Sequence, residues 1–173
     1  GGAINIVTLE PSFHRTGSID VTYGSFNEVR AKGFVSMPLS DNLAFGISGL
    51  YAHNDGYIHD VLRGHKIGKL NSSMVRGKLL FTPTDKLKFL LTLSWVNDTD
   101  PSQVEYQPYE DHAPSVPGIT YPLPPYHAAL NSLSEMNTKI FTASLRVTYD
   151  LEKISFMSQT SYSDPHTYSS TDS

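Results

Sequence analysis

Apolar and polar residues alternate along several long stretches of this chain, as they do in β-strands that have one apolar and one polar face. The clearest stretch covers residues 86–96. Its apolar positions are Leu87, Phe89, Leu91, Leu93 and Trp95, its polar positions are Lys88, Thr92 and Ser94, and Leu90 is the exception. A strand of about ten residues rises roughly 33 Å, which at a tilt of about 45° covers the hydrocarbon of an outer membrane. The alternation therefore predicts the wall of a membrane β-barrel.

Six other segments show the same alternation. Their apolar positions include Ile19 and Val21, Val29 and Val35, Phe45 and Ile47, Val75 and Leu79, Phe141 and Leu145, and Ile154 and Phe156. Short turns are predicted at 24–27, 38–42, 82–85 and 150–153, and long loops at 53–72 and 97–137. The turns rich in Pro and Asp then share one end of the sheet, and both long loops share the other. Outer-membrane barrels have this asymmetry, with short periplasmic turns and long extracellular loops.

Composition excludes several classes of protein. At 173 residues the chain has the length of one domain, and it lacks the run of about 18 apolar residues that predicts a membrane helix. The formal net charge of −4 disfavours nucleic-acid binding, and the absence of cysteine excludes disulfides, thiolate metal sites and cysteine nucleophiles. Neither a Gly-x-Ser-x-Gly motif nor a phosphate-binding loop motif is present, so we predict neither enzymatic activity nor a cofactor.

Four short motifs resemble those of TonB-dependent outer-membrane receptors. Residues 1–8 read Gly-Gly-Ala-Ile-Asn-Ile-Val-Thr, which is similar to the segment that closes the plug of that family. The other three are Thr-Tyr-Gly-Ser-Phe-Asn at 22–27, Asp-Gly-Tyr at 55–57 and Arg-Gly-Lys-Leu-Leu-Phe-Thr-Pro-Thr-Asp at 76–85. All four follow the order in which the family carries them.

The resemblance implies an all-β protein in two parts. Residues 1–12 would be the end of a plug domain, and residues 13–173 the N-terminal part of an antiparallel transmembrane β-barrel. The chain would then supply about seven strands of a barrel of about 22 strands, a size known among outer-membrane transporters. A signal peptide, the TonB box and the residues that close the barrel are expected outside this chain.

The resemblance also implies a function, which is TonB-dependent active uptake of a scarce solute across the bacterial outer membrane. Such a solute is often a ferric siderophore, a vitamin or a sugar. The implied partners are TonB of the inner-membrane energy-transducing complex, reached through an N-terminal segment outside this chain, outer-membrane lipid and lipopolysaccharide, and the small-molecule solute. The residues leave two alternatives open: a passive outer-membrane porin, and a soluble secreted β-sandwich that serves as a binding module.

Basic residues recur on the predicted inward face of the strands. They are Arg30, Lys32, Arg76, Lys78, Lys88, Lys139 and Arg146. Inside a barrel such residues hold a plug by ion pairs and hydrogen bonds, line a path for an anionic solute, or face water. The expected plug and lumen contacts are Gly1, Gly2, Asn5, Arg30, Lys32, Arg76, Lys78 and Arg146.

The longest predicted loop, at 97–137, is rich in proline and contains several tyrosines and histidines. Its candidate ligand-binding residues are Tyr106, Tyr109, His112, Tyr121, Tyr126 and His127. Aromatic side chains give a large contact area at low entropic cost, and prolines stiffen a loop. A ligand-gathering loop and an ordinary surface loop both fit this composition. The seven histidines show no recognised zinc spacing. In the loop 53–72, His59 and His65 with Asp60 are the candidates for a metal, but solvated loop histidines are the favoured interpretation, so no metal site is predicted.

Overall fold

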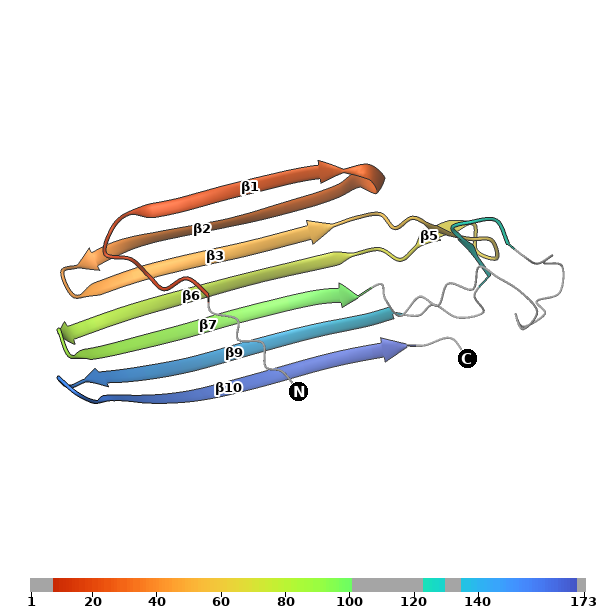
Figure 1. The fold of residues 1–173 in the computed structure, drawn as a ribbon. Helices are drawn as coiled ribbons and strands as arrows, with labels where there is room; N and C mark the ends of the chain where they lie inside the picture. The colour runs from red at the N-terminus through yellow and green to blue at the C-terminus, as the bar shows by residue number, and fades with distance from the viewer. Residues whose placement is uncertain (1–7, 101–122, 130–134, 171–173) are drawn as a thin grey trace.

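The computed structural model of the chain describes residues 8–100, 123–129 and 135–170. They form an all-β structure dominated by one seven-stranded antiparallel sheet in the order β1-β2-β3-β6-β7-β9-β10 (Figure 1). Its strands are β1 (Thr16–Gly24), β2 (Glu28–Ser40), β3 (Leu43–His53), β6 (Asn71–Thr84), β7 (Leu87–Asp100), β9 (Glu135–Asp150) and β10 (Ser155–Ser170). Each of the seven segments with alternating residues therefore forms a strand, and each strand pairs with the next in a continuous meander.

The register of the sheet places the predicted apolar positions on one common face. Leu91 of β7 lies between Leu79 of β6 and Leu145 of β9, and partners across an antiparallel ladder share a face. Ile19 of the edge strand β1 is 82% exposed, and Trp95 of the inner strand β7 is 44% exposed. Other exposed apolar side chains of this face are Val21, Val35, Ile47, Val75, Leu93, Phe141, Leu145 and Phe156. The described residues thus leave a broad apolar surface uncovered.

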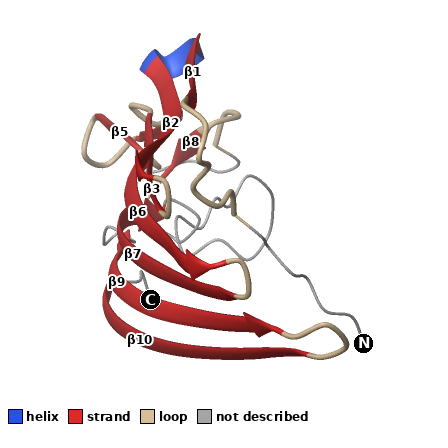
Figure 2. Ribbon diagram, turned by 90° about the vertical axis from the view of Figure 1, so that its left-hand side faces the viewer, coloured by secondary structure: helices blue, strands red, loops and turns tan. Residues whose placement is uncertain are grey.

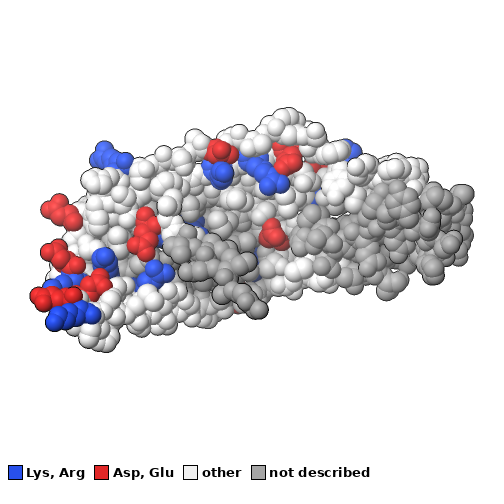
Figure 3. Space-filling model, in the orientation of Figure 1, with Lys and Arg blue, Asp and Glu red and all other residues white. Residues whose placement is uncertain are grey.

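The sheet is curved, and the first described residues lie on its concave side (Figure 2). The apolar face is the convex one, because Ser36 and Lys78, which contact these first residues, belong to the opposite set of alternating positions. Figure 3 views the concave face, over which acidic and basic side chains are spread. One sheet therefore separates an apolar convex surface from a polar concave one.

One predicted facing is wrong. Lys139 was expected on the inward face with the other basic residues, but it pairs with Asn97, two positions beyond the pair of Trp95 and Phe141. Because side chains repeat every second residue, Lys139 lies on the convex face with those two aromatic residues. It is exposed there, near the loop end of the sheet.

The strands on both sides of the longest loop extend further than predicted. β7 continues to Asp100, and β9 begins at Glu135, with Asp100 paired to Met136. The alternation of apolar residues ends near Val96, but backbone hydrogen bonds do not depend on apolar side chains, so the ladder continues through polar residues. The loop that was expected at 97–137 is shorter for this reason.

A second, smaller sheet forms at the loop end, and the sequence did not predict it. Its order is β5-β4-β8, with β4 (Ile58–Asp60) and β5 (His65–Ile67) from the first long loop and β8 (His127–Ala128) from the second. β4 pairs antiparallel with β5 and parallel with β8. Strands of two or three residues are too short to show an alternating pattern. The described part of the chain contains no helix of the length and apolarity needed to cross a membrane.

Gly56 is required for the approach to this small sheet. Its φ is +77°, and a Cβ at this position would lie 2.2 Å from the backbone oxygen of Ile67. Gly64, in the turn between β4 and β5, also has a positive φ of +70°, but a Cβ there would meet no atom within 4 Å. Gly56 is therefore required because a side chain would clash, whereas Gly64 is favoured only because of its backbone conformation.

We predict that Gly56→Ala opens the small sheet, whereas Gly64→Ala costs only about 1 kcal/mol of its local stability, as expected for a positive φ alone. Hydrogen exchange of the His59 and Val61 amides reports on this sheet, because they donate to Tyr126 O and Ala128 O at 2.8 and 2.9 Å. Equal protection of these amides in the two variants would show that the close approach at Gly56 is unimportant.

Candidate functional site

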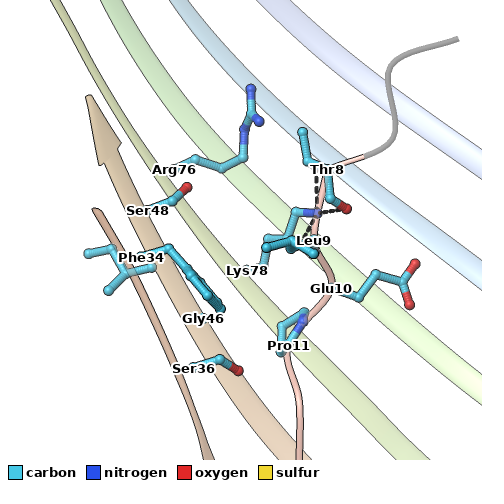
Figure 4. A pocket seen from close by; sticks show the side chains of 11 residues that line it. Thr8, Leu9, Glu10, Pro11, Phe34, Ser36, Gly46, Ser48, Arg76 and Lys78 are labelled. Atoms are coloured by element: carbon cyan, nitrogen blue, oxygen red, sulfur yellow. Dashed lines mark hydrogen bonds between the residues drawn. The ribbon is translucent and has the colours of Figure 1, made fainter. Parts of the chain in front are cut away.

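Residues 8–13, here called the N-terminal segment, cross the concave face of the large sheet (Figures 1 and 2). Figure 4 shows Thr8 to Pro11 passing over side chains of β2, β3 and β6. The segment runs across the strands and adds no strand of its own to the sheet. Its backbone groups therefore need other hydrogen-bond partners, and the side chains of the wall supply several of them.

Lys78 of β6 is the main anchor of the N-terminal segment. Its Nζ donates hydrogen bonds to Thr8 O at 3.1 Å, Thr8 Oγ1 at 2.7 Å and Leu9 O at 2.7 Å. An ammonium group has three donors, so this arrangement uses its full capacity. Lys78 is only 8% exposed. A cation whose donors are all satisfied by the segment fixes its position, because moving the segment away would break three charge-assisted hydrogen bonds.

Further contacts fix the segment on either side of Lys78. The Ser12 amide donates to Ser36 Oγ at 2.7 Å, and Arg146 Nη1 of β9 lies 3.3 Å from Glu10 Oε1. Pro11 lies over Gly46, where a Cβ would be 3.5 Å from Pro11 Cγ. A longer side chain at position 46 would occupy the place of the proline ring.

Phe13 explains the one exception to the alternation in β7. Leu90 points to the concave face, where it forms a small apolar cluster with Ala44 and Leu80, and Phe13 packs against this cluster. Ala44 is fully buried, and Leu80 and Leu90 are 8% and 7% exposed. The concave face is therefore apolar where Phe13 of the N-terminal segment covers it.

A cavity of about 320 Å³ lies between the N-terminal segment and the wall. Phe34, Ser48 and Arg76 line it together with Lys78 and the segment itself (Figure 4). Arg76 forms no ion pair with a carboxylate of the described residues, and its guanidinium contacts Met74 Sδ at 3.8 Å. The cavity wall thus carries a cation whose charge the surrounding residues leave available.

The remaining predicted plug and lumen residues divide into two groups. Arg30 and Lys32 lie on β2. Arg30 forms an ion pair with Glu28, and Lys32 forms one with Asp20 at 3.9 Å, so both contact the wall itself and not the N-terminal segment. Gly1, Gly2 and Asn5 lie outside the described residues. Of the five basic residues expected as plug and lumen contacts, Lys78 and Arg146 contact the segment and Arg76 lines the cavity beside it.

At the loop end, the structure brings together residues of three separate connections. Tyr57, before β4, lies 5.9 Å from Phe26 of the turn η1 (Ser25–Asn27) and 5.9 Å from Tyr126, before β8, measured between ring centroids. Of the predicted ligand-binding residues, Tyr126 and His127 belong to this cluster. Tyr106, Tyr109, His112 and Tyr121 lie outside the described residues. Sequence reasoning missed Phe26 and Tyr57, although both stand in motifs it had singled out.

Asp55 connects the turn η1 to the first long loop. Its carboxylate accepts a hydrogen bond from Asn27 Nδ2 at 2.6 Å and lies 3.3 Å from His53 Nε2, and its amide donates to Phe26 O at 3.0 Å. The hydrogen bond from Asn27 is the main reason that the pKa of Asp55 lies below its ordinary value. The carboxylate is therefore charged at neutral pH and holds the two connections together.

Asp60 is held inside the small sheet by its own loop. Its side chain is fully buried, and it accepts hydrogen bonds from Arg63 Nη1 at 2.8 Å and from the Leu62 amide at 3.0 Å. Burial acts to raise the pKa of Asp60, but these hydrogen bonds outweigh it and hold the pKa below its ordinary value. Within the described residues, no group of three or more His, Asp or Glu side chains is placed to hold a metal ion.

The contacts described above suit non-covalent binding. The segment on the concave face makes a fixed contact with the wall, and the loop end presents aromatic, hydroxyl, imidazole and ammonium groups to solvent. No family model matches the chain, and no solved structure matches its fold.

We predict that Lys78→Met loosens the N-terminal segment. Hydrogen bonds from a charged donor contribute about 1.5–3 kcal/mol each, so hydrogen exchange of the peptide containing the Ser12 amide should accelerate by about tenfold or more. Lys32→Met is the matched control, because it removes the same charge from the same face and Lys32 pairs with Asp20. Unchanged exchange in the Lys78 variant would contradict its role as the anchor.

Proposed function

We propose that this chain is the end of the plug and the first part of the barrel of a TonB-dependent receptor in the bacterial outer membrane. The receptor takes up a scarce solute, such as a ferric siderophore, a vitamin or a sugar. The observation that carries this proposal is the N-terminal segment fixed across the polar concave face of a sheet whose convex face is apolar and uncovered. A plug that fills a barrel requires this kind of contact with the inner wall.

The convex face supports a location in a lipid bilayer. A strand of 14 to 16 residues, such as β7 or β9, is longer than the roughly 10 residues that cross an outer membrane, so its polar end projects beyond the lipid. The apolar band then contacts hydrocarbon, and Trp95 and Phe141 lie at its loop end, where aromatic girdles occur. The short turns at 38–42, 82–85 and 150–153 would face the periplasm, and both long loops the medium.

The edges of the sheet support a larger barrel than this chain alone supplies. β1 and β10 each have one partner and one unpaired edge in the described structure. Unpaired backbone groups are not tolerated in lipid, so further strands must complete the ring. By the resemblance described above, the complete barrel has about 22 strands, as in plugged outer-membrane transporters.

Transport in this proposal is a conformational cycle without covalent chemistry. The solute binds at the loop end. TonB, which receives energy from the inner-membrane energy-transducing complex, then displaces the plug so that the solute passes along the concave face. The cations of that face, of which Arg76 borders a cavity, suit a hydrated path. A passive porin shares such a wall but has no reason to fix a chain segment across it. A soluble β-sandwich would cover the apolar face with a second sheet.

The proposal is tested by uptake in cells that produce the full-length gene product. The readout is the uptake of a labelled compound by the cells. The compounds are a panel of siderophores loaded with labelled iron, supplied under iron limitation, and labelled vitamins and sugars. We expect uptake of one of these solutes to require both TonB and the proton gradient. Uptake that persists without TonB would identify a passive pore, and no uptake of any class by the inserted protein would reject transport of these solutes.

The facing of the wall has its own test. If Leu91 contacts lipid, Leu91→Arg should cost about 2–4 kcal/mol of barrel stability, and Thr92→Arg, on the concave face, far less. The two positions are adjacent in β7, so strand position and substituted residue are matched. The measurement is unfolding of the full-length protein in lipid vesicles, and equal costs for the two variants would refute the assignment of faces.

A further inference from the structure

Three side chains form a row across one face of the small sheet, here called the polar row. They are Lys66 of β5, His59 of β4 and His127 of β8. The register pairs His59 with Lys66 on one side and with His127 on the other, and directly paired residues point to the same face. The imidazole rings of His59 and His127 are 5.4 Å apart between centroids. The opposite face of this sheet carries the buried residues Ile58 and Asp60.

Three exposed aromatic rings border the polar row. Phe26, Tyr57 and Tyr126 form a chain of ring contacts, and they are 53%, 50% and 61% exposed. Lys66 Nζ lies 5.9 Å from the centroid of the Phe26 ring, which connects the rings to the row. His127 follows Tyr126 directly in the chain, and a single residue separates Tyr57 from His59. Rings and row therefore form one continuous surface.

The backbone is strained where it presents two of these rings. Phe26 has a φ of 60° and Tyr126 a φ of 63°, in the left-handed region that bulky residues rarely adopt. Asn27 beside Phe26 has a φ of 55°. Each such residue costs on the order of 1–3 kcal/mol, and strain of this kind accumulates where a ligand is held.

The hydrogen bonds of the row leave it ready to accept a ligand. His127 Nδ1 lies 2.9 Å from Pro125 O, so Nδ1 carries the proton and Nε2 is available on the other side of the ring. Of the nearby carboxylates, Asp60 is bound by Arg63, and Asp55 accepts a hydrogen bond from Asn27 and lies 3.3 Å from His53. Lys66 makes only a minor contribution to the lowered pKa of Asp55. No carboxylate of the described residues forms an ion pair with Lys66.

The charge of the row selects the kind of ligand. A fixed ammonium next to two imidazoles repels a free metal cation and attracts an anion, and protonated imidazoles add to that attraction. The adjoining rings favour a ligand that itself contains an aromatic ring, through stacked and edge-to-face contacts. A purely aliphatic anion would use the row and leave the rings unused.

We propose that the polar row and its three aromatic rings form the binding subsite for a small aromatic compound that carries a negative charge. This inference rests on the proposed uptake function, in which it names the class of solute and the residues that first receive it. Lys66, His59 and His127 take the anionic group. Phe26, Tyr57 and Tyr126 take the ring.

The test measures binding to the full-length protein in detergent by equilibrium dialysis. The probe is the ferric complex of 2,3-dihydroxybenzoate, which is anionic and aromatic, and ferric citrate is the anionic complex without rings. We expect Lys66→Met to weaken binding of the aromatic complex by at least tenfold, and His59→Gln with His127→Gln to weaken it similarly. Lys66→Arg, which keeps the charge, should retain binding.

The chain offers matched controls for both kinds of substitution. Lys69→Met removes an exposed lysine from the same loop, and His65→Gln removes a histidine whose position pairs with Asp60 and not with the polar row. Both should bind the aromatic complex like the unmodified protein. Equal affinity of the Lys66 and Lys69 methionine variants would overturn the proposal. Equal binding of ferric citrate and the aromatic complex would overturn the role of the rings.

The inference and the proposed function fail in different ways. Uptake that depends on TonB but is unaffected by Lys66→Met would overturn the subsite and leave the receptor function intact. Binding of the aromatic complex that depends on Lys66, in cells whose uptake does not need TonB, would support the subsite and overturn the receptor function.

Discussion

The register of the seven-stranded ladder is the constraint on which the rest of the structure depends. A shift of one residue between any two strands would exchange the faces of everything beyond that point, because side chains alternate with a period of two. The ladder from β1 to β10 keeps its pairing without such a shift across the apolar band, and the two irregularities, near Pro38 and Pro83, lie beside the turns. Proline lacks an amide donor, so these irregular positions are where it disturbs the ladder least.

The concave face differs between the region that the N-terminal segment covers and the region toward the edge strand β1. At the turn end it covers an apolar cluster around Leu90, and near the middle its carbonyl groups hold the ammonium of Lys78. Toward β1 the concave face is occupied by ion pairs within the wall itself, such as Lys32 with Asp20. The wall therefore has side chains suited to the segment only where the segment passes. Leu90, the exception to the alternation in β7, marks one of those places.

The sequence predicted the strands of the large sheet well because each carries a local signal that repeats every two residues. The segment from Leu87 to Trp95 shows it most clearly, and its five alternating apolar residues all lie on one face. The small sheet could not be predicted in this way, since β8 has two residues and pairs with a strand distant in the chain. The anchor at Lys78 was identified as a basic lumen residue, but its partners are mostly backbone carbonyls, which no residue pattern reveals. Lys139 was misplaced because its charge, and not its position relative to Phe141, was used to orient it.

The parallel pairing of β4 with β8 has a consequence for the loop end of the sheet. These two strands are separated in the chain by β5, β6 and β7, so their pairing closes a long loop at a cost in entropy. The hairpin of β4 and β5 and the turn η1, by contrast, form from neighbouring residues. The surface around His127 therefore depends on a contact between residues far apart in the chain. A solute that contacts both loops would stabilise this pairing, which the chain holds through two residue pairs.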